Sequence, residues 1–152
     1  MLMLLMSIGD DLYAIESTAV VEIIPRVSLR KVHHVPEYVA GLFQYRGAIV
    51  PVIDLCHLIR GTPSRFCLST RIIMVSYSPQ ERTRQYLGLV AEKITETFNK
   101  PQTELVDSGI RVKEAPYLGG ILMHEKGIIQ YIRLDKLFTD AQNTYLLTAG
   151  ES

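Results

Sequence analysis

The feature that most constrains the fold of this chain is an internal repeat. When the two halves are aligned with a shift of 79 positions, residues 38–42 (YVAGL) lie over residues 117–121 (YLGGI), and residues 52–58 lie over residues 131–137. Upstream, a shift of 74 positions aligns residues 13–15 with 87–89, and also aligns Val20 and Glu22 with Ile94 and Glu96. Few residues are identical, but turns and apolar positions recur in the same order, as in a duplicated unit. We therefore expect two small β-barrels of similar topology packed as one unit.

Composition supports a folded β-rich chain. The apolar fraction of 47% and the charged fraction of 21% exclude a disordered chain. Val and Ile are abundant, and eight Tyr with no Trp favour strands. Lys and Arg total 16, as do Asp and Glu, so nothing in the net charge favours nucleic acid or an anionic membrane.

The cysteines and the N-terminus indicate the compartment. Two cysteines are too few for a disulfide scaffold and indicate a reducing environment. The apolar run Met1–Met6 has no basic segment before it and no cleavage site, and it is too short to span a bilayer. We expect a cytoplasmic protein with no membrane insertion.

Hydrophobic patterning predicts an all-β fold with short helices. The clearest element is a hairpin whose arms, residues 38–45 and 48–53, flank Arg46-Gly47. Pro51 cannot donate to a sheet ladder, so its arm is expected to be an edge strand or to contain a bulge. Residues 100–115 are expected to be irregular, and the chain beyond Thr139 has no strong pattern. Further strands are predicted at 2–8, 12–15, 20–24, before Pro36, and at 71–77, 85–91, 94–98, 117–123 and 127–132, with short helices at 55–59 and 134–138.

The motifs of common catalytic and metal sites are missing from the sequence. Phosphate-binding glycine motifs are absent, and His33 and His34 are neighbours that a strand would point to opposite faces. We therefore predict no cofactor and no metal. A thiol enzyme that uses Cys56 with His57 is one alternative, and this alternative predicts that Cys56→Ser abolishes function. A buried inert thiol fits the pattern better. A small barrel that binds nucleic acid or another ligand is a second alternative, but it needs a basic groove with interleaved aromatic residues.

The hairpin tip Arg46-Gly47 is the best candidate for a functional site. A solvated turn is the simpler interpretation, but the arms around it are almost wholly apolar. A rigid hairpin with one guanidinium and an adjacent Tyr45 has the composition of a protein-binding hot spot. Glu22 lies among Val and Ile residues. A solvent-facing position on a strand is the simpler interpretation of this carboxylate, and an ion pair with Arg46 is the more specific hypothesis.

The segment from Gly41 to Leu55, GLFQYRGAIVPVIDL, closely resembles the signature of the CheW chemotaxis coupling proteins. Residues 8–15, 20–23, 87–90 and 117–121 support the resemblance, which extends from about Leu4 to Phe138. It implies the CheW-like fold, two intertwined five-stranded SH3-like β-barrels. It also implies one domain over residues 1–140, with lobes mainly at 10–62 and 66–138 that share strands, and a C-terminal tail at 141–152.

The resemblance implies a non-enzymatic adaptor that links the cytoplasmic tip of a methyl-accepting chemoreceptor to the regulatory domain of a CheA-type histidine kinase. Such a protein is cytoplasmic and peripheral to membrane-bound receptor arrays, and self-association in array rings is a further contact to consider. By position, the receptor side corresponds to Arg46, Glu22, Val20, Tyr45 and Gly47. The kinase side corresponds to the neighbourhood of Gly41, Phe43, Ile49, Val50 and Val52.

The sequence departs from the family pattern at Gln44-Tyr45, where the family has Asn-Leu, and this change is expected to alter the receptor contact. Residues 68–72 (LSTRI) and the compact N-terminus are similar to coupling proteins of Wsp-type surface-sensing systems. In those systems the kinase controls a cyclic-di-GMP synthase.

Overall fold

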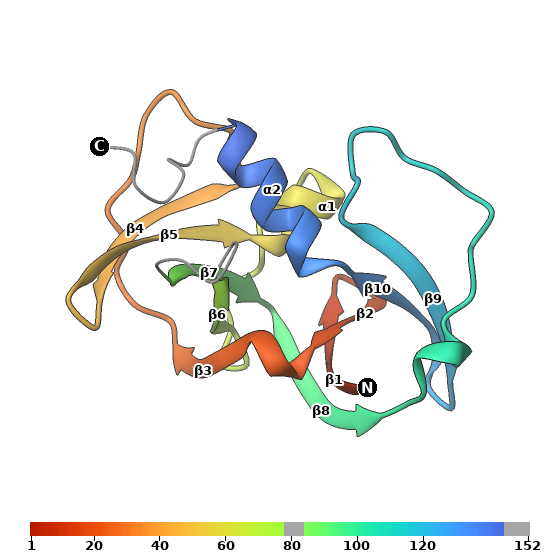
Figure 1. Cartoon of the computed structure of the whole chain (residues 1–152). Coiled ribbons are helices and arrows are strands. Elements are labelled where there is room, and N and C mark those ends of the chain that lie inside the picture. The colour runs from red at the N-terminus through yellow and green to blue at the C-terminus, as the bar shows by residue number, and fades with distance from the viewer. Residues whose placement is uncertain (78–83, 145–152) are drawn as a thin grey trace.

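The computed structural model describes residues 1–77 and 84–144, whose strands form two five-stranded sheets (Figure 1). One sheet has the order β8-β1-β2-β10-β9 and the other has the order β3-β6-β7-β5-β4. Neighbouring strands are antiparallel except for the parallel pairs β2–β10 and β5–β7. The strands are β1 (Leu2–Ile8), β2 (Asp11–Glu16), β3 (Val20–Pro25), β4 (Val39–Tyr45), β5 (Ala48–Asp54), β6 (Arg71–Tyr77), β7 (Gln85–Ala91), β8 (Lys93–Asn99), β9 (Leu118–His124) and β10 (Gly127–Ile132).

The duplication read from the sequence is confirmed by the strand order. Under the shift of 79, β4 and β5 correspond to β9 and β10, and under the shift of 74, β2 and β3 correspond to β7 and β8. Each pair of equivalent strands has the same place in its own sheet. The sheets also exchange strands, because β1 and β2 join β8, β9 and β10, while β6 and β7 join β3, β4 and β5. A boundary near residues 62–66 therefore does not separate the two sheets.

The apolar N-terminus is explained by the position of β1. Met3 and Leu5 lie in the core of the first sheet, whereas Leu4, Met6 and Ile8 lie in a central cluster with residues of both sheets. A strand buried on both faces needs a continuous apolar run rather than an alternating one. The same holds for β6 in the other sheet, where Ile72 and Met74 alternate with Ile73 and Val75. The central cluster is what packs the two barrels into one unit.

Two short helices cover this central cluster. Helix α1 (Leu55–Arg60) is capped by Asp54, whose carboxylate accepts from the backbone N–H groups of Cys56 and His57, and it ends at Gly61 in the left-handed conformation with φ 79°. Helix α2 (Leu134–Thr144) extends six residues beyond the predicted 134–138, and the sequence has no glycine or proline after Phe138 until Gly150. Residues 145–152 of the predicted tail lie outside the described residues. In the described part of the chain, no helix has the length and apolarity needed to cross a membrane.

The strand predicted before Pro36 is wrong. Residues 26–38, all of them described, contain only an isolated bridge in which Arg30 and Leu42 exchange backbone hydrogen bonds of 2.8 Å. Residues 100–115 are irregular, as predicted, apart from a 3-10 turn at Gln102–Glu104. They make the equivalent bridge, Val106 to Ile121. Each loop therefore lies along the outer edge of one strand and pairs with it at one point, residues 26–38 with β4 and residues 100–115 with β9. We call these two loops the straps.

The expectation for Pro51 was wrong as well. Strand β5 lies between β7 and β4, so it is not an edge strand. Its parallel pairing with β7 begins at Val52, the residue after the proline. A register shift does occur in the β4–β5 ladder, but it lies in β4, between Val39 and Gly41.

Candidate protein-binding site

The tip of the β4–β5 hairpin has an unusual backbone. Arg46 and Gly47 form a two-residue turn, and both have positive φ values, 50° and 79°. This is the pattern of a type I′ turn, which matches the twist of the flanking strands. Asn or Gly is the usual residue at the first position, because a side chain with a Cβ is strained there. The positive φ of Arg46 therefore carries a conformational free-energy cost.

Glu22 joins the two edges of its sheet. It lies on β3, and the hydroxyl of Tyr45 at the end of β4 donates to its Oε1 at 2.6 Å. The Nη2 of Arg46 lies 3.3 Å from the same oxygen, so the ion pair predicted from the sequence is present. Since β3 and β4 are opposite edges of the five-stranded sheet, this contact closes the barrel. Both charged groups remain accessible, with side-chain exposures of 55% for Arg46 and 44% for Glu22.

Tyr45 is the buried member of this group. Its ring packs edge-on against Tyr86, with centroids 5.6 Å apart, and the guanidinium of Arg46 lies 5.1 Å from the ring centroid. Burial raises the pKa of Tyr45, and the hydrogen bond to Glu22 raises it further, so the phenol stays a donor. The departure from the family pattern at this position thus adds a hydrogen bond that a leucine does not make.

Val20 lies at the start of β3, two residues before Glu22. It is partly buried against the central cluster, and the β3–β6 ladder has a register shift between Val20 and Glu22. The structure thus brings Val20, Glu22, Tyr45, Arg46 and Gly47 to the end of β4 and the start of β3.

The residues assigned to the kinase side separate into two groups. Val50 and Val52 are 1% and 0% exposed and belong to the core of the barrel. Gly41 is covered by the strap, because a Cβ there would lie 2.6 Å from the carbonyl oxygen of Arg30. Phe43 is partly buried against the same core, and Ile49 is 67% exposed. Of the five residues, Ile49 is the most exposed. Val50 and Val52 are buried in the barrel, so they can affect a binding surface only by packing beneath it.

The outer face of the hairpin was missed by the sequence reasoning. In the β4–β5 register, Gln44 pairs with Ile49 and Leu42 pairs with Pro51. Paired residues share one face of a sheet, and period-two alternation places this face opposite Val50 and Val52. The β5 sequence, AIVPVID, is apolar on both faces up to Ile53, so no apolar–polar alternation marks this face in the sequence. We call Leu42, Gln44, Ile49 and Pro51 the outer hairpin face.

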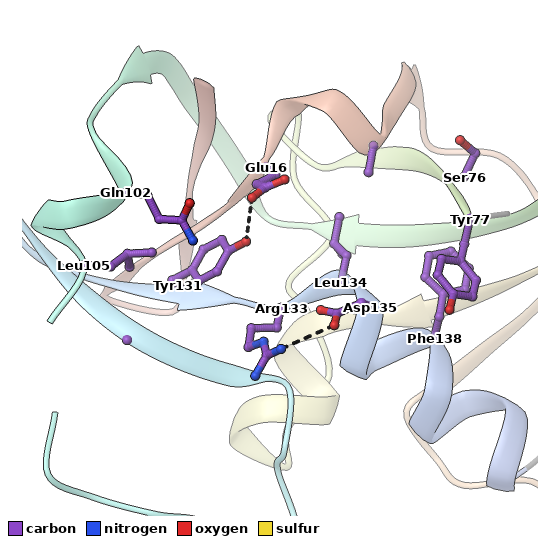
Figure 2. A pocket seen from close by; sticks show the side chains of 12 residues that line it. Glu16, Ser76, Tyr77, Gln102, Leu105, Tyr131, Arg133, Leu134, Asp135 and Phe138 are labelled. Atoms are coloured by element: carbon purple, nitrogen blue, oxygen red, sulfur yellow. Dashed lines mark hydrogen bonds and ion pairs between the residues drawn. The ribbon is translucent and has the colours of Figure 1, made fainter. Parts of the chain in front are cut away.

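A pocket of about 550 Å³ lies between the two barrels (Figure 2). On one side the hydroxyl of Tyr131 donates to Glu16 at 3.1 Å, and burial beside Glu16 raises the pKa of Tyr131 to about 12. On the other side Tyr77 stacks on Phe138 of α2, with ring centroids 4.8 Å apart. Ala19, the neighbour of Val20, also lines the pocket. Residues distant in the sequence form it, so no local pattern predicts it.

The second barrel has its own closing contact. Glu96 on β8 corresponds to Glu22 under the shift of 74, and His124 at the end of β9 corresponds to Tyr45 under the shift of 79. The Oε1 of Glu96 lies 3.1 Å from Lys126 Nζ and 3.6 Å from His124 Nε2. Both distances are within ion-pair range. Neither contact has the geometry of a hydrogen bond, so the buried Oε1 of Glu96 accepts none from these two side chains. The two hairpins therefore share an architecture and differ in the chemistry of their tips.

The cysteines give little support to thiol chemistry at Cys56. Cys56 is buried within the central cluster, and burial raises the pKa of its thiol. The Nε2 of His57 lies 3.6 Å from Glu37. The exposed thiol is Cys67, whose pKa is lowered to about 7 by hydrogen bonds from Ser69 and Thr70. Among the described residues, no group of three or more His, Cys, Asp or Glu is arranged to hold a metal ion.

Comparison with known proteins identifies a family that covers most of the chain. The model of the CheW-like domain family matches residues 2–142. The probable chemotaxis protein CheW of Rhizobium etli is 24% identical over 139 residues, which cover 90% of this chain and 86% of that protein. The chemotaxis protein CheW of Helicobacter pylori is 29% identical over 98 residues, 64% of this chain and 56% of that protein. The matched region thus spans little more than half of the Helicobacter protein.

A solved structure shares the fold. The scaffolding protein TtCheW from Thermoanaerobacter tengcongensis matches with a TM-score of 0.75 at 24% identity, over 88% of this chain and 84% of that chain. Two five-stranded sheets with few short helices are thus the architecture of a known scaffold protein, which confirms the predicted fold class.

Proposed function

Because the chain belongs to the CheW-like domain family, we propose that it is a non-catalytic chemotaxis adaptor that couples methyl-accepting chemoreceptors to a CheA-type histidine kinase. It works in the cytoplasm, peripheral to membrane-bound receptor arrays. The observation that carries the proposal is the tip of the β4–β5 hairpin, where Tyr45 and Arg46 converge on Glu22 and leave two charged groups accessible.

The receptor side of the proposed adaptor is the group Glu22, Arg46, Tyr45, Val20 and Gly47. The buried Tyr45 hydroxyl fixes the carboxylate of Glu22, so Glu22 and Arg46 present a preorganised pair to a partner. Preorganised charges lose little side-chain entropy on binding. The pocket between the barrels begins beside Val20, so it is suited to take an apolar side chain of the receptor tip.

The kinase side is the outer hairpin face. Leu42, Ile49 and Pro51 present apolar surface there, and Ile49 is the most exposed of them, at 67%. An exposed aliphatic side chain on a rigid hairpin suits a small interface with a barrel of the kinase regulatory domain. Phe43, Val50 and Val52 support this face from within the barrel, and Gly41 admits the strap that holds its edge.

Self-association in array rings would use the second hairpin. The β4–β5 and β9–β10 hairpins project on opposite sides of the molecule (Figure 1). Ile128, which corresponds to Ile49 under the shift of 79, is 60% exposed, and Met123 beside it is 61% exposed. Two different exposed hairpins permit a head-to-tail contact, which closes into rings if the rotation allows.

The test is a titration of the purified chain against a receptor-tip fragment and, separately, against the regulatory domain of a CheA-type kinase. Arg46→Glu reverses the charge beside Glu22 and should abolish receptor binding while it leaves kinase binding within about twofold. Ile49→Asp should do the opposite. Arg111→Glu is the matched control, because Arg111 is also an exposed arginine in an ion pair, with Asp107 at 2.6 Å, on the loop beside β9.

Small interfaces of this kind bind at about micromolar strength. If neither partner binds at tens of micromolar, the adaptor proposal falls. If Arg46→Glu and Arg111→Glu weaken receptor binding equally, the assignment of the receptor side falls and the adaptor role stands. The thiol-enzyme alternative makes a separate prediction, that Cys56→Ser removes function, whereas the adaptor should retain both binding activities.

A further inference from the structure

Two stretches of the chain hold a large excess of positive charge. Residues 23–36 and 55–77 contain none of the 16 Asp and Glu side chains, and the whole chain has formal net charge zero. The rest of the chain therefore carries the matching negative excess, so charge is unevenly distributed along the sequence. The two stretches contain six of the 16 Lys and Arg residues, namely Arg26, Arg30, Lys31, Arg60, Arg65 and Arg71.

These two stretches meet at an open pocket of about 370 Å³. Arg26, Val27 and Leu29 line it from the first stretch, and Phe66 and Ile72 line it from the second. Ile72 is fully buried and belongs to the core of the barrel, so the floor of the pocket is apolar. The pocket therefore offers an apolar cavity with one basic lining residue, Arg26. Arg71 lies beside it in the β3–β6 ladder and donates to the backbone of Leu68, and we call Arg26, Phe66, Leu68 and Arg71 the rim of the pocket.

The rim carries two large apolar side chains that the fold leaves uncovered. Phe66 is 67% exposed and Leu68 is 97% exposed. The guanidinium of Arg26 lies 4.4 Å from the centroid of the Phe66 ring, which holds the ring in place through a cation–π contact. An exposed apolar patch that is bordered by polar groups is the kind of surface at which proteins bind partners.

The charges of the rim are available to a partner. Within the described part of the chain, neither Arg26 nor Arg71 forms an ion pair with a carboxylate. Arg71 donates only to the backbone oxygens of Leu68 and Thr70, at 2.6 Å and 2.9 Å. It lies next to Arg26, because Pro25 pairs with Arg71 in the β3–β6 ladder.

The one carboxylate in the pocket is already satisfied. Asp54 is buried, and its two oxygens accept from the backbone N–H groups of Cys56, His57 and Ser64 and from the Ser64 hydroxyl. It lies at the N-terminus of α1, where a carboxylate is stabilised. Asp54 therefore caps the helix and leaves the positive rim to dominate what a partner meets.

We propose that this surface docks an acidic linear segment of a partner protein, with one apolar side chain in the pocket and flanking carboxylates on Arg26 and Arg71. The surface is separate from the receptor side proposed above. Ala40, which also lines the pocket, lies six residues before Arg46, which corresponds to about 20 Å along an extended strand. The proposal therefore adds a further contact to an adaptor and does not depend on the contacts proposed above.

A protein segment fits this surface better than nucleic acid does. Single-stranded nucleic acid needs a basic groove with several aromatic residues on which bases stack, and Phe66 is the single aromatic residue of this pocket. A cavity that opens onto the aliphatic core instead suits an aliphatic or aromatic side chain.

The experiment is a fluorescence-anisotropy titration with a labelled peptide that has one central leucine flanked by glutamates. We expect binding at about 10–100 µM in low salt, weakened in physiological salt. Arg26→Glu should weaken it about tenfold, and Phe66→Ala should weaken it severalfold. The matched controls are Lys113→Glu for the charge and Ile110→Ala for the apolar surface, because both residues are exposed on the other barrel.

Results of three kinds would overturn the proposal. The first is the absence of peptide binding, or binding that Arg26→Glu and Lys113→Glu weaken equally. The second is equal binding of a peptide with glutamines in place of glutamates, or stronger binding of oligothymidine. The third is concentration-dependent self-association that Arg26→Glu abolishes, since a second copy of the chain would then occupy the pocket.

Discussion

At the scale of single residues, the proposed receptor side depends on how Glu22 is held. One oxygen of its carboxylate is shared by a buried phenol and an exposed guanidinium. The phenol contact is short and shielded, whereas the guanidinium contact is longer and open to solvent. The two contacts therefore have different tasks, because Tyr45 fixes the carboxylate and closes the barrel, and Arg46 supplies the charge that a partner meets.

This division predicts different effects on stability. Tyr45→Phe removes a hydrogen bond to a charged acceptor and should lower the free energy of unfolding by about 1 kcal/mol. Arg46→Asn should change it by less than about 0.5 kcal/mol, because exposed ion pairs contribute little and Asn tolerates the positive φ of Arg46. Urea denaturation followed by circular dichroism measures both values. A larger loss for Arg46→Asn than for Tyr45→Phe would contradict the assignment.

A second residue-scale prediction concerns acid. Glu92 is buried, and although burial raises the pKa of its carboxyl, hydrogen bonds from the backbone of Arg65, the backbone of Gly9 and the Arg65 side chain together lower it below its ordinary value of 4.5. A carboxyl whose pKa is depressed on folding stabilises the protein above its unfolded pKa and loses that contribution as the pH falls through its folded pKa. Glu92 should therefore stabilise the fold fully at neutral pH and progressively less below about pH 4.5.

The measurement is the difference in unfolding free energy between the unmodified chain and Glu92→Gln, taken from pH 7 down to pH 3. The difference should be largest at neutral pH and should shrink below about pH 4.5. Asp107→Asn is the comparison, since the pKa of Asp107 is lowered to about 2 by the Arg111 guanidinium, so its own contribution falls only at lower pH. A difference for Glu92→Gln that grows as the pH falls would contradict the role given to Glu92.

At the scale of elements, each barrel depends on a loop that straps its edge strand. The carbonyl oxygen of Arg30 lies over Gly41, and that of Val106 lies over Gly120, so close that a Cβ would be 2.6 Å and 2.7 Å away. The two glycines are equivalent under the shift of 79. They admit the straps because they have no side chain, and the straps satisfy edge groups of β4 and β9.

The straps predict a graded effect of alanine. Gly41→Ala suffers both the clash and a backbone with φ +150°, so it should cost the most, about 2 kcal/mol or more. Gly120→Ala suffers the clash alone, because its φ is not positive. Gly47→Ala, with φ +79° and open space around it, is the control for strain alone and should cost about 1 kcal/mol. Thermal unfolding ranks the three, and a larger loss for Gly47→Ala than for Gly41→Ala would contradict the strap.

The same elements show how far sequence reasoning reaches. Most strands were predictable within one or two residues, because β1 and β6 are apolar throughout and the hairpins are marked by turns. The Arg46–Glu22 pair was one of two interpretations open from the sequence, because a carboxylate among apolar residues either faces solvent or has a partner, and the structure shows the pair. The strand expected before Pro36 was wrong. Within residues 26–38, Arg30 alone forms a β-bridge, whereas Val27 and Leu29 line a pocket. The outer hairpin face and the pocket between the barrels depend on side-chain direction and on packing between distant strands.

At the scale of the whole molecule, the duplication separates the proposed contacts. The two barrels share one central cluster, and their hairpins project on opposite sides (Figure 1). One tip carries the pair Glu22 and Arg46, whereas the other carries Glu96 with His124 and Lys126. A rigid double barrel with unlike surfaces is suited to hold two partners in a fixed relation, which is what an adaptor must do.

The central claim is that this chain bridges two partners at once. The most direct measurement is sedimentation of the chain with a receptor-tip fragment and a CheA-type regulatory domain, each at a concentration that saturates its own binary complex. We predict a ternary complex that Arg46→Glu converts into a binary complex with the kinase domain and that Ile49→Asp converts into a binary complex with the receptor fragment. Two binary complexes that exclude each other would contradict the claim, because one partner would then displace the other instead of being coupled to it.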